Sequence, residues 1–257
     1  MGGILLWIIY FNKPTAEELE AEKAAQTEQV ESQDTDVASL PVAQTAPAVA
    51  SDSITNIALQ NRLGAFAYSG SLPSAKEGAT TTISNDVLEI KVSNKGGYIT
   101  EVKMLQHSTY DSIPVYLIKD GNSTFNVSFS TSDNRNLNTK DLFFEPSPSK
   151  NGNNDVLSMK LKVSDTQFLE YRYEMKPNEY MVDFSIRSQG LNSVINASNT
   201  INLDWTLNGY RHEKSIRTEN TMYSYYYYKT DDEVDYLNAG KTEIVNDVDW
   251  VAYKQHF

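Results

Sequence analysis

Apolar and polar residues alternate one by one over much of the chain after residue 87. The alternation occurs in five segments: residues 88–92, 157–163, 169–175, 180–186 and 201–207. In the first of them, Leu88, Ile90 and Val92 alternate with charged residues. A period of two predicts half-buried β-strands, which place one face against a core and the other in water. Because long helical patterns between these segments are missing, we predict an all-β fold of antiparallel sheets packed as a sandwich.

Turn-forming residues separate the predicted strands. Residues 177–178, Pro-Asn, lie between the third and fourth segments. Gly96 and Gly97 follow the first strand, and because no helix comes after them they predict a turn with positive φ and not a phosphate-binding loop. Residues 130–155 are crowded with Asn, Ser, Asp and Pro around one apolar patch at residues 142–144. There we expect a long loop that carries one short strand.

The N-terminal part of the chain follows other patterns. An unbroken apolar run comes first, consisting of Ile4, Leu5, Leu6, Trp7, Ile8, Ile9, Tyr10 and Phe11. The run is too short to cross a bilayer, which takes about 20 residues. We interpret it as the end of a transmembrane anchor, since a polar tail and no hairpin partner follows it. A buried strand is the alternative interpretation.

An acidic linker connects this run to the predicted strands. Residues 15–31 are rich in Ala, Glu and Gln, and Thr15 with Glu18 forms a capping box, so a solvated helix is expected. Residues 32–53 are small, polar and punctuated by proline, which is typical of a disordered segment. We therefore divide the chain into the end of an anchor (1–13), an acidic, partly helical and partly disordered linker (14–56) and a β-domain (57–257) that opens on a short, helix-like patch.

Charge and composition exclude several classes of function. The formal net charge is -12, and no stripe of Lys and Arg is present to bind phosphates, so nucleic acid is not an expected partner. The chain has no Cys, which excludes a disulfide framework, a thiolate nucleophile and a Cys-bound metal. The missing Cys also argues against a purely structural lipoprotein, which needs one at its lipidation site.

Candidate catalytic residues are few. His107, His212 and His256 stand singly, without the H-x-H or H-E-x-x-H spacing of metal sites. No G-x-S-x-G sequence marks an activated serine. We therefore expect no catalysis, no metal and no cofactor.

A run of tyrosines is the most unusual local feature. Residues 223–229 read Tyr-Ser-Tyr-Tyr-Tyr-Tyr-Lys, which places aromatic rings on both faces of a predicted strand. One set of rings can then pack while the other is displayed for a sugar or a protein partner. The candidate contact residues are Tyr225, Tyr226, Tyr227 and Tyr228. Burial of all of them between sheets is the alternative.

Four pieces of the sequence, taken in order, resemble the large periplasmic domain of the YidC family of membrane protein insertases. The first is the apolar run with the acidic segment behind it, and the second is residues 85–99 with their Gly-Gly turn. The third is residues 171–187, which contain Y-x-Y-x-M-K-P-N-E-Y-x-V-x-F. The last is Trp-Val-Ala-Tyr-Lys-Gln-His-Phe at residues 250–257. Each piece is loose alone, but together they cover nearly the whole chain.

The resemblance implies a β-supersandwich related to the galactose-mutarotase-like fold, on the periplasmic side of a bacterial inner membrane. In this family a bundle of transmembrane helices, absent from this sequence, inserts nascent membrane proteins. The resemblance therefore carries over no catalytic residue. It implies a scaffold and docking surface for the Sec translocon and its accessory subunits.

A sugar-binding or aldose-epimerase domain is the alternative on the same fold, because fold alone does not decide function. Mutarotase chemistry needs a paired acid and base in one cleft. His107, His212 and Glu213 are the only candidates for that pair, and their neighbours do not resemble the enzyme motifs.

Overall fold

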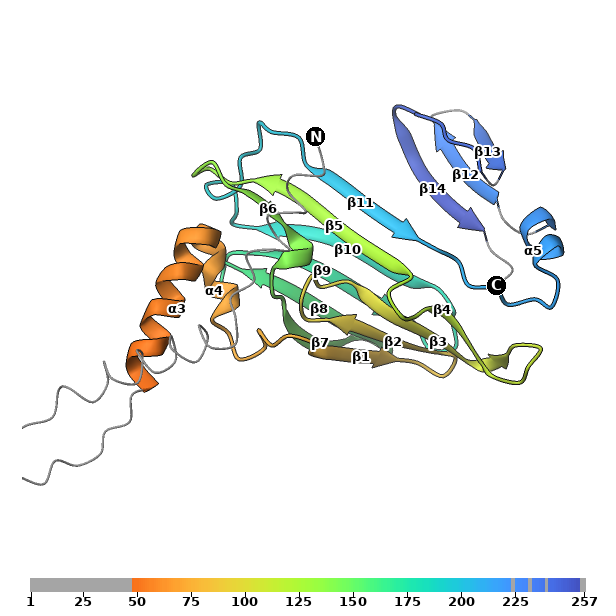
Figure 1. Cartoon of the computed structure of the whole chain (residues 1–257), viewed down its shortest axis with the longest axis horizontal. Helices are drawn as coiled ribbons and strands as arrows, with labels where there is room; N and C mark the ends of the chain where they lie inside the picture. The colour runs from red at the N-terminus through yellow and green to blue at the C-terminus, as the bar shows by residue number, and fades with distance from the viewer. Residues whose placement is uncertain (1–47, 223–224, 231–232, 239, 255–257) are drawn as a thin grey trace, which may run out of the picture. The chain divides into compact units, whose positions relative to one another are not determined.

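The computed structural model describes residues 48–257 except 223–224, 231–232, 239 and 255–257 (Figure 1). Most of this part is antiparallel β-sheet, which confirms the predicted all-β fold. In the same part, no helix is both long and apolar enough to cross a bilayer. The predicted anchor at residues 4–11 and the predicted helix at residues 15–31 lie outside the described residues.

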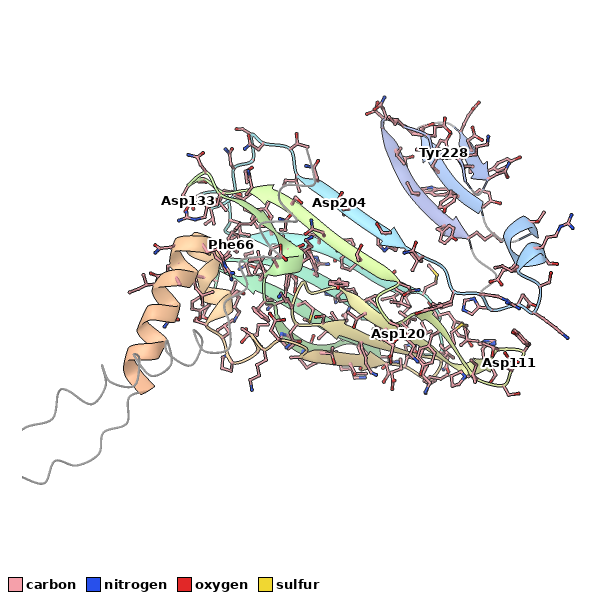
Figure 2. All side chains as sticks on the ribbon, in the orientation of Figure 1. Phe66, Asp111, Asp120, Asp133, Asp204 and Tyr228 are labelled. Carbon is pink, nitrogen blue, oxygen red and sulfur yellow. The ribbon has the colours of Figure 1, made fainter. Side chains whose placement is uncertain are left out.

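Helical segments precede the sheets: α3 (Ala48–Leu63), η1 (Gly64–Phe66) and α4 (Ala67–Gly70). The last residues of the segment predicted as a disordered linker therefore belong to a helix. At Gly64 the φ angle is +57°, and a Cβ there would come within 2.8 Å of the Asp133 carboxylate, so glycine is needed to turn the chain. The turn buries the ring of Phe66 completely, 5.3 Å from the Phe129 ring (Figure 2).

Two four-stranded antiparallel sheets make up most of the structure. In the order β1-β2-β3-β4, the first contains β1 (Thr80–Ser84), β2 (Leu88–Ser93), β3 (Ile99–Ser108) and β4 (Pro114–Ile118). In the order β10-β9-β8-β7, the second contains β7 (Glu145–Asn151), β8 (Asn154–Lys162), β9 (Phe168–Met175) and β10 (Val182–Gln189). The first four predicted strands correspond to β2, β8, β9 and β10. β2 shows the physical cause of the alternation: Leu88, Ile90 and Val92 are buried, and the charged residues between them are half-buried.

Two three-stranded antiparallel sheets follow. The first has the order β11-β5-β6, with β5 (Ser123–Ser130), β6 (Asn136–Asn138) and β11 (Asn202–Leu207), the fifth predicted strand. The second, which we call the tyrosine sheet, has the order β13-β12-β14, with β12 (Tyr225–Thr230), β13 (Val234–Asn238) and β14 (Val248–Lys254). Short helices η2 (Thr139–Asp141) and α5 (Ile216–Met222) lie in the connections.

Aromatic side chains fill the core between the sheets. Tyr171 on β9 is completely buried, with the rings of Phe144 and Phe125 at 4.8 and 5.6 Å. Burial raises the pKa of the Tyr171 hydroxyl to about 12, because the charged form would lose its hydration. The neighbouring Tyr173 hydroxyl donates a hydrogen bond of 2.8 Å to the carbonyl of Gly97.

The predicted Gly-Gly turn is confirmed and has two physical causes. Both Gly96 and Gly97 have positive φ, at +87° and +66°. In addition, a Cβ on Gly97 would lie 2.8 Å from the ring of Phe144, so the backbone approaches the core too closely for any side chain. Asn178 also has a positive φ, of +55°, in the predicted turn before β10.

The prediction of a long loop at residues 130–155 is wrong. This stretch contains β6, η2, β7 and the start of β8, and β7 pairs with β8 over its whole length. Pro146 and Pro148 concealed β7, because proline is normally excluded from strands. They are tolerated here since β7 is the last strand of its sheet, where a missing N–H costs no ladder hydrogen bond.

The predicted fourth strand, residues 180–186, is shifted in the structure. Its first two residues, Tyr180 and Met181, precede β10 and are exposed, and the strand continues to Gln189. The sequence pattern starts two residues before β10, because Tyr180 has the same spacing as the inward-facing residues of the strand. Its side chain instead contacts His107 at the end of β3, with 3.0 Å between the Tyr180 hydroxyl and His107 Nε2.

A buried carboxylate stabilises the hairpin of β7 and β8. Glu174 on β9 accepts hydrogen bonds from the side-chain amides of Asn154 (2.7 Å) and Asn151 (2.9 Å), and forms an ion pair with Arg172. These donors, Asn154 first, lower the pKa of Glu174 from 4.5 to about 2. The charged form of the carboxylate is therefore the one that the fold stabilises.

Candidate functional site

The sandwich is open at one edge, between β10 and β11. Each is the last described strand of its sheet. The register pairs Phe184 with Tyr173 and Trp205 with Phe125, so their side chains point toward the same interior as the core residues. Nevertheless, 65% of Trp205 is exposed, and Phe184 is exposed as well. Inward-facing apolar side chains are therefore accessible from solvent at this edge.

Two apolar cavities continue along this edge, and we call them together the β10–β11 groove. The first, of about 230 Å³, is bounded by Phe184 and Trp205 and by the end of β4 and the start of β5, and no charged residue lines it. The second, of about 320 Å³, contains Ile186, Leu203 and Ile201 and one charged residue, Arg187. Polar side chains such as Asp204 lie on the other face of β11 (Figure 2). The groove has the chemistry of a protein core and not of a catalytic cleft.

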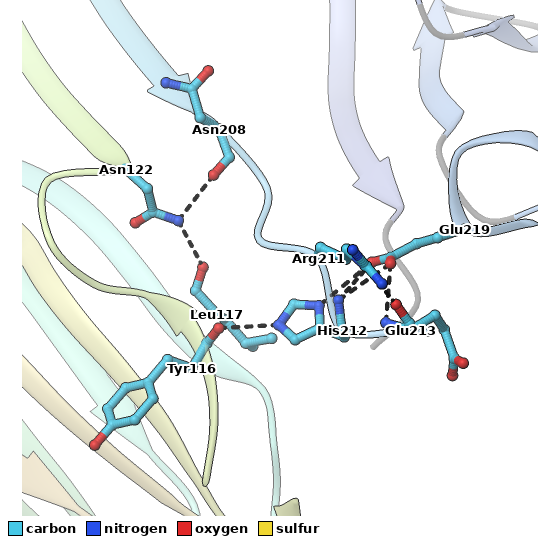
Figure 3. Close-up of polar contacts among 8 residues, drawn as sticks. All are labelled: Tyr116, Leu117, Asn122, Asn208, Arg211, His212, Glu213 and Glu219. Carbon is cyan, nitrogen blue, oxygen red and sulfur yellow. Dashed lines mark hydrogen bonds and ion pairs between the residues drawn. The ribbon is translucent and has the colours of Figure 1, made fainter. Parts of the chain in front are cut away.

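The chain leaves this edge along a segment that is fixed to the β4–β5 connection (Figure 3). The Asn122 side chain donates to the carbonyls of Leu117 (3.2 Å) and Asn208 (2.9 Å), and Asn208 donates its backbone N–H back to the Asn122 carbonyl at 2.8 Å. Two residues on, the Tyr210 hydroxyl donates to the Lys119 carbonyl at 2.6 Å. We call residues 208–213 the tether, because they connect β11 to α5 and the tyrosine sheet.

His212 and Glu219 complete the attachment of the tether. Only 4% of His212 is exposed, and its Nε2 donates to the Tyr116 carbonyl at 3.1 Å, which fixes the proton on that nitrogen. Its Nδ1 faces Glu219 Oε1 at 3.7 Å (Figure 3). The same carboxylate accepts the backbone N–H groups of His212 (3.1 Å) and Glu213 (3.0 Å). This arrangement closes a turn and buries His212 in the attachment of the tether.

The candidates for mutarotase chemistry lie in different environments. His107 is at the exposed end of β3, against Tyr180, whereas His212 is buried against the Tyr116 backbone and Glu219. Neither histidine lines a cavity of the β10–β11 groove. The sequence showed His212 only as a histidine standing singly, and the structure buries it in the tether. His256 lies outside the described residues.

The tyrosine run forms a strand, as predicted, in the centre of the tyrosine sheet. Cross-strand pairs place Tyr227, Tyr236 and Trp250 on one side, which we call the Trp250 face. Tyr226 and Tyr228 lie on the opposite side, the Tyr226 face, with the Tyr226 and Tyr253 rings stacked at 4.7 Å.

Both faces of the tyrosine sheet carry exposed side chains, Val251 (66%) among them on the Tyr226 face. On the Trp250 face, Trp250 and Tyr236 are 43% and 55% exposed. On the Tyr226 face, Tyr228 is half-buried and its hydroxyl donates to Asp235 at 3.4 Å. Partial burial and the nearby Asp235 carboxylate raise the pKa of Tyr228. Among Tyr226, Tyr227 and Tyr228, whose side chains the structure describes, Tyr226 is the exposed one, at 38%.

Comparison with known families decides the identity of this β-domain. The family model described as the YidC periplasmic domain matches residues 80–257, from the first residue of β1 to the end of the chain. The chain belongs to the YidC periplasmic domain family. Two relatives named "Membrane protein insertase YidC" match it over its full length, at 31% identity in Parabacteroides distasonis and 33% in Porphyromonas gingivalis.

The matched region is only part of each YidC relative. The chain spans 41% of the length of both proteins, and 43% of a third relative of the same name, from Chlorobaculum tepidum, at 27% identity. The resemblance that the sequence predicted is therefore confirmed for the periplasmic domain. Neither the β10–β11 groove nor the tether was predicted, because alternation shows which face of a strand is inward and not which strand lies at an edge.

Proposed function

We propose that this chain forms the non-catalytic periplasmic part of a membrane protein insertase and serves it as a scaffold and docking surface. The family match over residues 80–257 carries this proposal, because it covers every strand of the structure. The insertase activity is taken from the names of the two relatives, and the chain spans 41% of their length. Insertion of nascent membrane proteins is accordingly assigned to the whole protein and docking to this domain.

The proposed location is the periplasmic side of a bacterial inner membrane. Residues 4–11 would provide the end of the anchor that holds the domain there, with the acidic segment behind them as a spacer. The chain has 22 Lys and Arg against 34 Asp and Glu, a net charge of -12. An anionic lipid surface would repel it, so docking is expected to involve proteins.

The proposed partners are the Sec translocon and its accessory subunits, and the Tyr226 face is the proposed contact surface. Tyrosine suits such a surface because its ring contributes a large apolar contact while its hydroxyl remains hydrated. Tyr226 is exposed and is supported from below by the stacked ring of Tyr253. A ring held rigidly in this way loses little entropy when a partner binds.

Photo-cross-linking in native membranes tests the proposal. A photoreactive phenylalanine analogue would replace Tyr226 in the whole protein, and a matched probe would replace Ser149, which is exposed on β7 in another sheet. We expect the Tyr226 probe to capture a translocon subunit and the Ser149 probe not to do so. Identical products from both positions, or no envelope protein from Tyr226, would contradict a docking role for this face.

A further inference from the structure

Two apolar surfaces of this chain are exposed in the structure and neither is suited to water. The first is the β10–β11 groove, where Ile201, Leu203 and Trp205 are all more than half exposed although they point inward. The second is the Trp250 face of the tyrosine sheet, with Val234 and Trp250 exposed. Exposed apolar patches next to unpaired strand edges promote aggregation, so a stable protein covers them.

We infer that these two surfaces cover each other: the Trp250 face of the tyrosine sheet closes the β10–β11 groove and leaves the Tyr226 face outside. The occupant of the groove would then be a segment of the same chain. This inference goes beyond the proposed function, since it holds whether or not the domain docks to a translocon.

The tether supports an occupant from the same chain. It begins where β11 ends, at the end of the groove lined by Trp205. Asn208 and Tyr210 fix it to the β4–β5 connection, and His212 fixes it to β4. Residues 214–224, which include α5, then connect the tether to β12 of the tyrosine sheet. A module held by a short connection has a high effective concentration, which favours it over any partner from solution.

The chemistry of the two sides of the tyrosine sheet selects the Trp250 face. Its cross-strand rows are Val234–Lys229–Trp250, Tyr236–Tyr227–Ala252 and, at the end of the sheet, Asn238–Tyr225–Lys254, and the Lys229 ammonium is paired with Asp249 at 2.9 Å. The first two rows can therefore be buried without leaving a new charge unpaired, while Lys254, in the end row, has to keep its ammonium in water at the rim. The Tyr226 face carries the Asp235 carboxylate, for which the groove offers no matching cation except Arg187 at its far cavity.

The closed arrangement also explains why the tyrosine sheet can be stable. Three short strands bury little surface by themselves and need packing against another layer. Closing the groove supplies that layer, as in a sandwich whose sheets face each other across shared apolar side chains. The tyrosine run is then divided between two roles, with Tyr227 inward and Tyr226 outward.

Tryptophan fluorescence of the full chain tests the inference. The chain has three Trp, so a Trp7→Phe, Trp250→Phe protein reports on Trp205 alone and keeps an aromatic ring on the face. We expect acrylamide to quench Trp205 weakly in this reporter. Replacing residue 250 by Thr instead of Phe, which keeps a strand-favouring residue, should raise the quenching constant several-fold. Tyr236→Thr in the reporter is a second variant on the same face.

The matched control is Val251→Ser in the reporter, because Val251 is exposed on the opposite face of the same strand. It should leave the quenching constant unchanged. Strong quenching of Trp205 in the reporter itself would overturn the inference. A low quenching constant that stays unchanged in the Trp250→Thr and Tyr236→Thr variants would also overturn it. A quenching constant that falls as protein concentration rises would mean that a second copy covers the groove, and would overturn it too. Far-ultraviolet circular dichroism establishes that each variant is folded.

Discussion

Trp205 on β11 is paired with Phe125 on β5 in the ladder of one sheet, yet the two rings differ sharply in exposure. Phe125 packs between Tyr171 and Phe184, both at 5.6 Å, whereas 65% of Trp205 is accessible. The cause is position, since β5 is the central strand of its sheet and β11 is an edge strand. One strand thus separates the core from the groove.

Phe66 should be the residue that attaches the N-terminal helix to the sandwich. Replacing it by Ala removes a completely buried ring and should lower the free energy of unfolding by about 3–5 kcal/mol. Chemical denaturation measures this change. Ile57→Ala, on the exposed side of the same helix, is the control and should cost less than about 1 kcal/mol. Equal effects would show that α3 is not held by this ring.

Gly97→Ala should be destabilising for two separable reasons. An L-residue with positive φ costs about 1–3 kcal/mol, and the new Cβ would also overlap the Phe144 ring. Gly152→Ala is the matched control, because Gly152 has a similar φ of +60° but open space around it. Thermal unfolding should show a larger loss for Gly97→Ala. If both variants lose the same stability, the close approach to Phe144 has no energetic weight.

Glu174 should make the stability of the domain depend on pH in the acid range. Its folded pKa of about 2 lies below the ordinary value of 4.5, so its stabilising contribution is complete above pH 4.5 and is lost as pH falls toward 2. Glu174→Gln should lower stability at neutral pH and remove this part of the acid dependence. Denaturation curves between pH 2 and pH 7 measure both effects.

The control for that measurement is Glu170→Gln, four residues earlier on the same strand and face. Its carboxylate accepts none of the hydrogen bonds that Glu174 receives from Asn151 and Asn154. It should keep the acid dependence of the unaltered protein. An unchanged pH profile in Glu174→Gln would contradict the stabilising role of the buried carboxylate.

Glu219 should hold the tether closed. Its carboxylate accepts the backbone N–H groups of His212 and Glu213, so Glu219→Ala exposes both donors and should speed their hydrogen exchange. Arg217→Ala, on the exposed side of α5, should leave both amides protected. Exchange followed by nuclear magnetic resonance at residue resolution gives the answer. Unchanged protection in Glu219→Ala would mean that the Nε2 contact of His212 with Tyr116 suffices.

The sequence predicted those parts of the fold that depend on local alternation. In β2 and β9 one face is buried along the whole strand, so apolar and polar residues alternate in the sequence. In β7 it is not, because Pro146 and Pro148 occupy an edge and most of the strand is exposed on both faces. Whether a strand lies at the edge or in the centre of a sheet depends on the assembled sheet, so the sequence of one strand does not predict it.

The candidate sites were predictable only in part. The tyrosine run was visible because four aromatic residues in a row are rare in a strand that buries one face. The burial of His212 was not, because it depends on packing against Tyr116, 96 residues earlier in the chain. The family resemblance was detectable because it rests on the order of several strands and turns, which the match over residues 80–257 confirms.

The central claim, that this domain works on the periplasmic side of the inner membrane, is tested most directly by labelling a single cysteine in spheroplasts, in which the inner membrane is still closed. This chain has no Cys, so Ser149→Cys, on the exposed strand β7, gives it one reactive site, and any Cys elsewhere in the whole protein is first replaced by Ser. A membrane-impermeant maleimide should label the whole protein in spheroplasts without lysis. Labelling that appears only after the inner membrane is broken would contradict the account.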